Sequence, residues 1–286
     1  NHLGTAPGMW FEKDETIYIS MPGVPFEMKY LVENEVLPRL EKTGKTKAIY
    51  HKTVLTQGIP ESMLAIRIED FENNLPGNIK LAYLPSPMSV RLRLSASGKN
   101  KIELEKLVEA EVEKLKQIIP EAIYGYGNET MAEAIGKLLM PEGKTLSVAE
   151  SCTGGFVSHL ITSVPGCSAW YKGAVTAYSN QVKTNVLGVK AETIEMFGAV
   201  SEETACEMAA GVRNLMGTDF AVATTGIAGP DGGSPEKPVG TVWIAVATPQ
   251  KVSATKFVFG DNRERNILRS GQSALQLLRK IIIEKQ

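Results

Sequence analysis

The feature that most constrains the fold is the alternation of strand-like and helix-like segments over residues 127–286. Strand-like runs stand at 145–149, 169–178, 220–225, 240–247 and 252–259, and helix-like runs at 130–139, 154–162, 191–196, 202–216 and 263–284. Such alternation predicts an α/β domain with helices layered on a central sheet. Ligands in these folds bind where strand C-terminal ends lead into loops and helix N-termini. The chemistry is therefore expected just after the predicted strands.

Two other patterns precede this domain. Residues 1–44 give one strand-like run at 16–20 and a helix-like run at 26–40, and a single strand cannot form a sheet. We expect a fragment of an α/β domain there. Short strands and helices then alternate at 48–56, 61–73, 79–84, 89–95 and 101–119. They predict a small α+β domain over residues 45–126, with the apolar stripe of its second helix in the core.

Composition narrows the classes of function. The chain has 286 residues, 43% of them hydrophobic, which is enough for two or three cores. A formal net charge of -1 removes the broad electrostatic attraction on which most nucleic-acid binders depend. The cysteines, Cys152, Cys167 and Cys206, fit no metal-ligand spacing. With no membrane-length apolar run and no signal peptide, we expect a cytoplasmic protein without a membrane partner.

A serine stands directly after a predicted strand, in Ala149-Glu150-Ser151-Cys152-Thr153-Gly154-Gly155. A nucleophile there has backbone N–H groups and the positive end of a helix dipole beside it, as an oxyanion intermediate requires. The two glycines also let a phosphate or carbonyl oxygen approach the backbone. The same pattern is equally typical of an ordinary helix N-cap. From the residues alone, both interpretations of Ser151 stay open.

A nucleophilic serine needs a base, which is usually histidine. His2 and His51 lie in the upstream segments, and the side chain of His159 is expected to project away from the serine loop. Lys183, in Tyr178-Ser179-Asn180-Gln181-Val182-Lys183, follows a strand end and acts as a base if desolvation keeps it neutral. A lysine at a helix start is commonly just solvated. The position of Lys183 after a strand end supports its role as the base, whereas its being a lysine does not by itself.

Two later segments also follow predicted strands. Thr225, Gly226 and Gly229 belong to a glycine-rich loop that is suited to wrap an oxyanion or phosphate, or that is simply a flexible surface loop. Farther on, Arg263 and Arg265 stand at the start of the last helix. Guanidinium groups bind phosphate bidentately, but these two are equally able to pair with acidic neighbours on the surface. Both alternatives remain open for each segment.

Five segments in one order resemble those of the CinA family: 149–155, 178–183, 198–202, 226–233 and 237–243. The similarity covers all of residues 127–286. It implies a nicotinamide-nucleotide amidase, which converts nicotinamide mononucleotide and water to nicotinate mononucleotide and ammonia without a cofactor. The family serine and lysine fall on Ser151 and Lys183. Because Asn262 interrupts the expected Gly-Asp-Arg, the choice between Arg263 and Arg265 stays open.

The resemblance extends upstream. Residues 4–9 and 21–25 are similar to the end of a molybdopterin-binding-like domain, which makes 1–44 a C-terminal remnant, and 45–126 is similar to a KH-type domain. In some relatives the intact first domain is a pyrophosphatase that acts on ADP-ribose, and this activity implies a divalent metal. We expect neither the pyrophosphatase activity nor the metal here. Gly58-Ile59-Pro60-Glu61 is not a GxxG loop. An architectural role is therefore expected in place of nucleic-acid binding.

The resulting hypothesis is a Ser/Lys mechanism acting on a pyridine nucleotide. Lys183 takes the proton of Ser151, which attacks the carboxamide carbon, so activity rises with pH through a lowered lysine pKa. The N–H groups near Thr153, Gly154 and Gly155 are assigned to hold the oxyanion. Tyr178, Asn180 and Thr225, together with the glycine-rich loop, are assigned to orient the reacting groups or the ribose. The 5′-phosphate is assigned to Arg263 or Arg265. The alternative is a non-catalytic nucleotide-binding module, or an interaction module associated with competence or DNA damage. A homodimer is compatible with the neutral composition.

Overall fold

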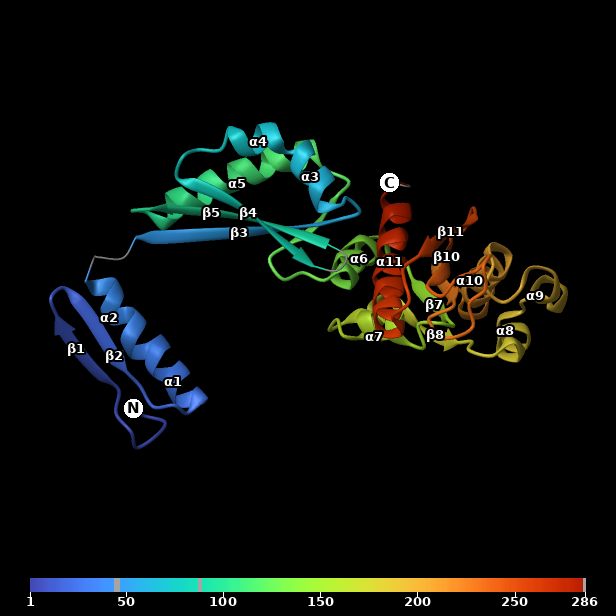
Figure 1. Cartoon of the computed structure of the whole chain (residues 1–286), viewed down its shortest axis with the longest axis horizontal. Helices are drawn as coiled ribbons and strands as arrows, with labels where there is room; N and C mark the ends of the chain where they lie inside the picture. Colours follow the sequence, from blue (N-terminus) through green and yellow to red (C-terminus); the bar gives the residue numbers. More distant parts are fainter. Residues whose placement is uncertain (44–46, 87–88, 285–286) are drawn as a thin grey trace.

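The structure is a computed structural model that describes residues 1–43, 47–86 and 89–284. Its strands form sheets of two, four and five strands, in that order along the chain. Figure 1 shows each sheet with its own helices. The expected fold class, a layered α/β domain after a small α+β unit and an α/β fragment, is confirmed.

The C-terminal part is built on one mixed sheet with strand order β11-β10-β9-β7-β8. The strands are β7 Leu146–Glu150, β8 Tyr171–Thr176, β9 Phe220–Gly226, β10 Thr241–Ala247 and β11 Val252–Val258. β7 pairs in parallel with β8 and β9, whereas β10 runs antiparallel to β9 and β11. The C-terminal ends of β7, β8 and β9 therefore meet at one end of the sheet, where β11 also ends.

Helices cover both faces of this sheet (Figure 1). On one side are α6 Met131–Leu139, α7 Phe156–Thr162 and α11 Arg263–Ile283, and on the other α8 Asn180–Leu187, α9 Ala191–Phe197 and α10 Glu202–Met216. Two short 3-10 turns, Met140–Glu142 and Cys167–Ala169, follow α6 and α7. None of the helices in the described part of the chain is long and apolar enough to cross a membrane.

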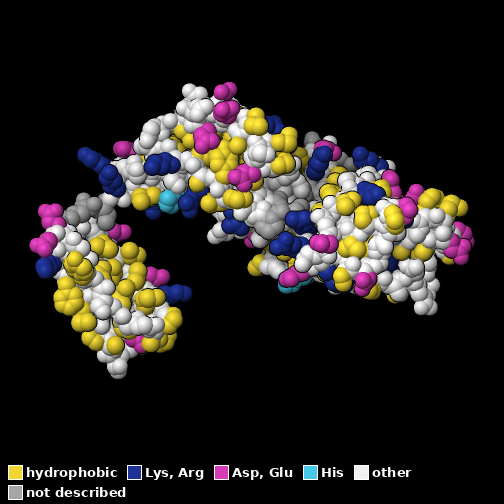
Figure 2. Space-filling model, in the orientation of Figure 1, with side chains coloured by type: hydrophobic (Ala, Val, Ile, Leu, Met, Phe, Trp, Pro, Cys, Tyr) yellow, Lys and Arg dark blue, Asp and Glu magenta, His cyan; other side chains and the backbone are white. Residues whose placement is uncertain are grey.

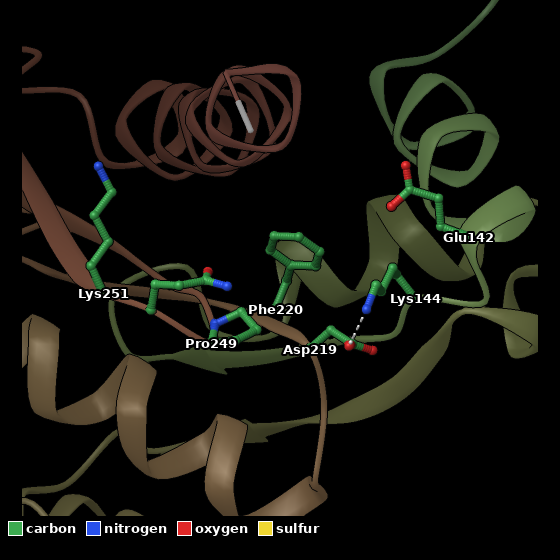
Figure 3. Close-up of a pocket in the computed structure, with 7 residues that line it drawn as sticks. Glu142, Lys144, Asp219, Phe220, Pro249 and Lys251 are labelled. Atoms are coloured by element: carbon green, nitrogen blue, oxygen red, sulfur yellow. Dashed lines mark hydrogen bonds and ion pairs between the residues drawn. The ribbon is translucent and has the colours of Figure 1, made fainter. Parts of the chain in front are cut away.

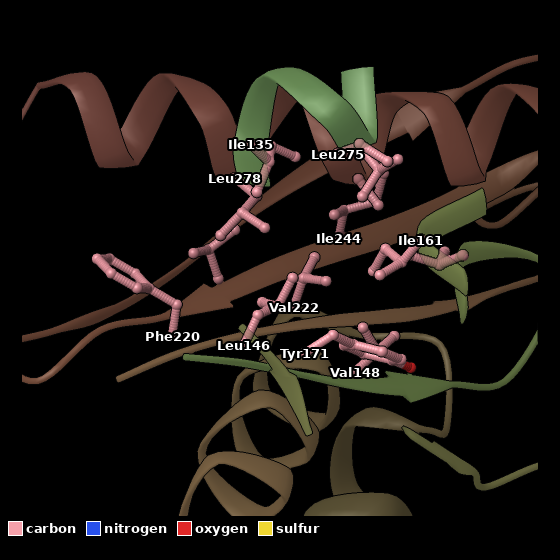
Figure 4. Close-up of a cluster of buried hydrophobic side chains, with 14 of the residues drawn as sticks. Ile135, Leu146, Val148, Ile161, Tyr171, Phe220, Val222, Ile244, Leu275 and Leu278 are labelled. Atoms are coloured by element: carbon pink, nitrogen blue, oxygen red, sulfur yellow. The ribbon is translucent and has the colours of Figure 1, made fainter. Parts of the chain in front are cut away.

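The two faces of the sheet carry different cores. Figure 4 shows the larger one, in which Leu275 and Leu278 of α11 approach Val222 and Ile244 of the sheet. On the opposite face, small strand residues such as Ala223 pack against α10. Because both faces are buried, the side chains of β7 and β9 are mostly apolar or small. Polar side chains at their ends are therefore candidates for function.

The middle unit is an antiparallel sheet of order β4-β5-β3-β6 with three helices. Its elements are β3 Ala48–Gln57, α3 Glu61–Arg67, α4 Glu69–Asn73, β4 Ile79–Ser86, β5 Ser89–Gly98, α5 Lys101–Ile118 and β6 Ile123–Tyr126. The stripe of α5 is buried in this core, as predicted. β6 was not predicted, because it has only four residues and pairs with β3 alone.

The first unit contains a hairpin and a helical segment. β1 Met9–Lys13 pairs with β2 Thr16–Ser20, and α1 Pro25–Leu31 continues through a π turn, Val32–Val36, into α2 Leu37–Lys42. The expectation of a single strand is wrong. The turn residues Asp14 and Glu15 both have positive φ without a glycine to signal the turn. Figure 2 shows hydrophobic side chains gathered on this unit, where Phe11 and Phe26 are exposed.

Candidate active site

Strand β9 holds two loops, the one after β7 and the one between α9 and α10, at the end of the sheet where β7, β8 and β9 finish. The backbone N–H of Ser151 donates to the carbonyl of Thr224 at 2.9 Å, which holds the serine against β9. The hydroxyls of Thr153 and Thr224 lie 2.7 Å apart and are buried. Thr225 Oγ1 donates to the carbonyl of Ala199 at 2.6 Å. Thr153 and Thr225 thus join loops through their hydroxyls.

Lys183 projects from α8 into this site. Its side chain is only 1% exposed, and its Nζ lies 3.1 Å from Ser151 Oγ. Nζ also donates to the carbonyl oxygens of Ala177 at 2.9 Å and Tyr178 at 3.2 Å. A neutral amine offers two N–H donors and one lone pair, which matches two carbonyls and one hydroxyl. In that state the lone pair is directed at the Ser151 hydroxyl.

The surroundings of Lys183 favour the neutral amine. Burial lowers the pKa of Lys183, because the charged form loses its hydration. Among the described residues, no carboxylate lies within ion-pair distance of its Nζ. α8 was not among the predicted helices, although Ser179 caps it by accepting from the N–H of Val182. The lysine is therefore fixed and buried rather than solvated.

The other candidate groups near Ser151 are unsuited to act with it. Burial raises the pKa of the neighbouring Cys152 thiol to about 12, so the reactive thiolate is absent at neutral pH. His159 is exposed on α7, as expected. His51 lies in the middle unit, where its Nδ1 is 2.8 Å from Ser95 Oγ. Lys183 is consequently the group placed to accept the proton of Ser151.

Glu150, which sequence reasoning missed, occupies the start of α7. Its fully buried carboxylate accepts the backbone N–H groups of Gly155 at 3.0 Å, Val157 at 3.0 Å and Ser158 at 2.8 Å. The N–H of Gly154 donates to the carbonyl of Ser151. The helix dipole therefore acts on Glu150. The expectation that Gly154 and Gly155 hold an oxyanion with their N–H groups is wrong, because both groups already have acceptors.

The geometry of α11 decides which of the two arginines, Arg263 or Arg265, reaches the site. Arg263 donates to the carbonyl of Gly229 at 2.9 Å and to the hydroxyl of Tyr178 at 3.2 Å, so it joins the loops after β8 and β9. Residues two apart on a helix point to different sides, so the side chain of Arg265 points away from these loops. Its backbone N–H donates to Asn262, which caps the helix. The structure thus brings Arg263, and not Arg265, to the site.

The other predicted residues have distinct environments. Tyr178 is 61% exposed beside Arg263, and Asn180 is exposed at the first position of α8. Gly226 is constrained by packing, since a Cβ there would lie 2.6 Å from Val242 Cγ2. Gly229 has a φ of 90°. The two glycines therefore shape the loop, while Tyr178 and Asn180 face solvent.

Sequence signals existed for two of the missed residues. Glu150 ends a strand whose other residues are apolar or small. A carboxylate just before a helix N-terminus is a natural partner of its free N–H groups. Asn266 is buried in α11 and donates to the carbonyls of Ala228 at 3.0 Å and Gly260 at 2.9 Å. An amide at a buried helix position indicates a loop held nearby.

The opposite end of the same sheet is a separate region. Figure 3 shows an open hollow there, in which Lys144 and Asp219 form an ion pair of 3.1 Å. Asp219 also accepts from the backbone N–H and hydroxyl of Thr145. None of the predicted site residues lines this hollow. The chemistry-bearing side chains are thus concentrated at one end of the sheet.

Two family models match the chain, one over the four-stranded sheet of the middle unit and one over the five-stranded sheet of the C-terminal part. The family model of the CinA C-terminal domain matches residues 128–282, and that of the damage-inducible protein CinA KH domain matches residues 51–125. The chain is 50% identical over 285 residues to a CinA-like protein of Flavobacterium psychrophilum, covering 99% of this chain and 68% of the relative. It is 43% identical to a putative competence-damage inducible protein of Halothermothrix orenii, covering 97% and 67%.

Solved structures match the C-terminal part. The competence/damage inducible protein CihA from Agrobacterium tumefaciens is 40% identical, with a TM-score of 0.52 over 55% of this chain and 94% of that one. The competence damage-inducible protein A from Klebsiella pneumoniae is 33% identical, with a TM-score of 0.53 over 55% of this chain and 97% of that one. In both cases the sequence identity exceeds 30% and the TM-score exceeds 0.5, so the sequence and the fold point to the same relatives.

Proposed function

The chain belongs to the CinA family, and on that premise we propose that its C-terminal domain hydrolyses the carboxamide of nicotinamide mononucleotide to nicotinate mononucleotide and ammonia. The observation that carries the proposal is the 3.1 Å separation of Lys183 Nζ from Ser151 Oγ, with the lysine buried and held by two carbonyls. This pairing of a nucleophile with an oriented base supports amide hydrolysis by covalent catalysis.

The first half of the reaction forms an ester on the serine. Neutral Lys183 takes the proton of Ser151 as Oγ attacks the carboxamide carbon. The N–H groups of Cys152 and Thr153 have no backbone acceptor within the described residues and are proposed to hold the oxyanion. The C–N bond then breaks, and the leaving nitrogen takes the proton from Lys183 and departs as ammonia.

The second half restores the enzyme. A water molecule enters the position left by ammonia and gives a proton to Lys183 while its oxygen attacks the ester carbon. The ester C–O bond breaks, and Ser151 Oγ regains its proton from the lysine. The product is the pyridine carboxylate, so one amide and one water yield one acid and one ammonia, and no redox group takes part.

The groups around the dyad are proposed to bind the nucleotide. Arg263 carries the charge nearest to Tyr178 and Gly229, and a guanidinium in this place is suited to the 5′-phosphate. The exposed ring of Tyr178 is proposed to orient the pyridine ring or the ribose beside it. Asn180, which is exposed at the first position of α8, is proposed to contact the ribose.

The test is ammonia release from nicotinamide mononucleotide by the purified chain. We expect Ser151→Ala and Lys183→Met each to lower kcat by at least ~100-fold, because general-base and nucleophilic catalysis contribute about 10² to 10⁴. Ser163→Ala serves as the matched control, since its hydroxyl bonds only to a backbone carbonyl at the end of α7. Release at the wild-type rate by Ser151→Ala would overturn the mechanism.

A second candidate follows from the names of the relatives. Several are called competence- or damage-inducible proteins, and the candidate is a module of that association whose loops hold a nucleotide without turnover. That candidate predicts that the wild-type chain binds nicotinamide mononucleotide by calorimetry yet releases no ammonia. Turnover by the wild-type chain that is lost in Ser151→Ala favours the amidase instead.

A further inference from the structure

A cavity of about 650 Å³ lies between the middle unit and the C-terminal domain. One wall comes from the loops after β3 and α5, and the other from α11, β11 and the start of α6. Figure 1 shows the C-terminal half of α11 beside the loop between β3 and α3. Arg279, which lines the cavity, follows Arg263 by about 24 Å along the helix at ~1.5 Å per residue. The cavity is therefore separate from the Ser151 site.

The two walls are held by direct contacts. Arg279 Nη2 donates to the carbonyl of Ile123 in the middle unit at 2.6 Å. The side chain of Gln276 packs against Gly58, where an added Cβ would lie 2.7 Å from Nε2. These contacts place the β3–α3 loop on the face of α11. The cavity between them is thus bounded on both sides.

Most of the surface of the cavity is apolar. Ile59 comes from the middle unit, and Met131, Phe257 and Leu277 come from the C-terminal domain. These side chains are partly buried by their own neighbours and leave an apolar space in the centre. A volume of this size is typical of sites for small organic molecules. The lining therefore suits a ligand with a ring-sized apolar body.

Ser273 adds a polar atom that needs a partner. Its side chain is 2% exposed, and its Oγ makes no hydrogen bond with any described residue. A buried hydroxyl without a partner is unusual in native proteins, because the lost hydration is not replaced. Ser273 lines the cavity but its hydroxyl is covered, so a ligand there supplies the missing hydrogen bond only when the neighbouring side chains shift.

Arg279 adds a guanidinium that makes no direct ion pair within the described ranges, although the charge of Glu129 acts on it. Of its five N–H donors, one is used by the carbonyl of Ile123, and no ion pair of Arg279 occurs in the described ranges. The other charged groups of the lining are already paired, Lys280 with Glu284 and Glu121 with Arg67. The guanidinium thus keeps N–H donors that an anion in the cavity is able to use.

We propose that this cavity is a second ligand site, which takes a small organic anion with an apolar ring body. Its acidic group pairs with Arg279, its ring lies between Phe257 and Ile59, and a further polar atom hydrogen-bonds to Ser273. Such a ligand contacts both units at once. It therefore stabilises the arrangement in which the middle unit lies on α11.

The test uses 1-anilinonaphthalene-8-sulfonate, which joins aromatic rings to one sulfonate. On the full chain we expect saturable binding and slower amide hydrogen exchange at residues 57–60, 120–123 and 273–284. Arg279→Gln should weaken binding at least ~10-fold, since a charge-assisted bond contributes about 1.5–3 kcal/mol. Ser273→Ala, which removes the hydroxyl and leaves the rest of the side chain, should weaken it ~3-fold or more.

Arg213→Gln is the matched control, because Arg213 also donates to a backbone carbonyl, that of Asp219, but lies on α10. Its affinity for the probe should equal that of the wild type. Circular dichroism verifies that each variant is folded, and Arg279→Lys, which keeps the charge, should restore most of the affinity. The proposal is overturned if the probe slows amide hydrogen exchange only in residues 1–43. It is also overturned if wild type and Arg279→Gln bind the probe with equal affinity.

Discussion

Replacing Glu150 by glutamine tests whether a buried charge holds the loop that carries Ser151. The carboxylate accepts three backbone N–H bonds of 2.8 to 3.0 Å. The glutamine oxygen is able to keep the bonds from Gly155 and Val157, but its amide NH₂ then faces the N–H of Ser158. One charge-assisted bond of about 1.5–3 kcal/mol is lost, and two others become neutral and weaken by about 1 kcal/mol each. We expect the free energy of unfolding to fall by about 3.5–5 kcal/mol.

The assay is urea unfolding followed by tryptophan fluorescence, to which Trp170 contributes from the core of the C-terminal domain, where it is 1% exposed. Glu195→Gln on the exposed face of α9 is the control, and it should change the free energy of unfolding by less than about 0.5 kcal/mol. A Glu150→Gln protein within about 1 kcal/mol of wild type would refute the inference that the carboxylate charge holds this loop.

Four further outcomes follow from the site. Ammonia release should rise with pH through the lowered pKa of Lys183, because only the neutral amine accepts a proton; a rise centred at the ordinary value of about 10.4 contradicts this. In steady-state kinetics, Arg263→Gln should raise KM for nicotinamide mononucleotide about 10-fold and affect kcat less. Arg265→Gln should change KM by less than about twofold. Gly226→Ala should lower the free energy of unfolding by about 1–3 kcal/mol in urea, because its Cβ collides with β10. Ammonia release should be unchanged by EDTA, and loss of activity that added metal restores would contradict the cofactor-free reaction.

Strand ends were the most predictable part of the site. Apolar runs are conspicuous in a sequence, and ligands bind after strand ends, so the segments at Ser151 and Thr225 were recognised as candidates. The short elements β1 and β6 escaped prediction because pairing with a neighbouring strand, and not local composition, forms them. Helix α8 escaped because its sequence is mostly polar.

Individual contacts were less predictable than positions. The hydroxyls of Thr153 and Thr225 resemble ligand groups in sequence, but they bond to Thr224 and Ala199, which are distant along the chain. The choice between Arg263 and Arg265 depends on where α11 begins relative to the Gly229 loop. Such partners follow from tertiary packing, which a single sequence pattern does not encode.

The amine of Lys183 and both carbonyls that hold it belong to the seven consecutive residues 177–183. A displacement of this segment carries the amine and its acceptors together, so the direction of the lone pair is preserved. Only the separation from Ser151 changes, and that residue belongs to a different loop. The reactivity of the pair therefore depends on a single distance, and substitutions outside the segment are able to tune it without rebuilding the base.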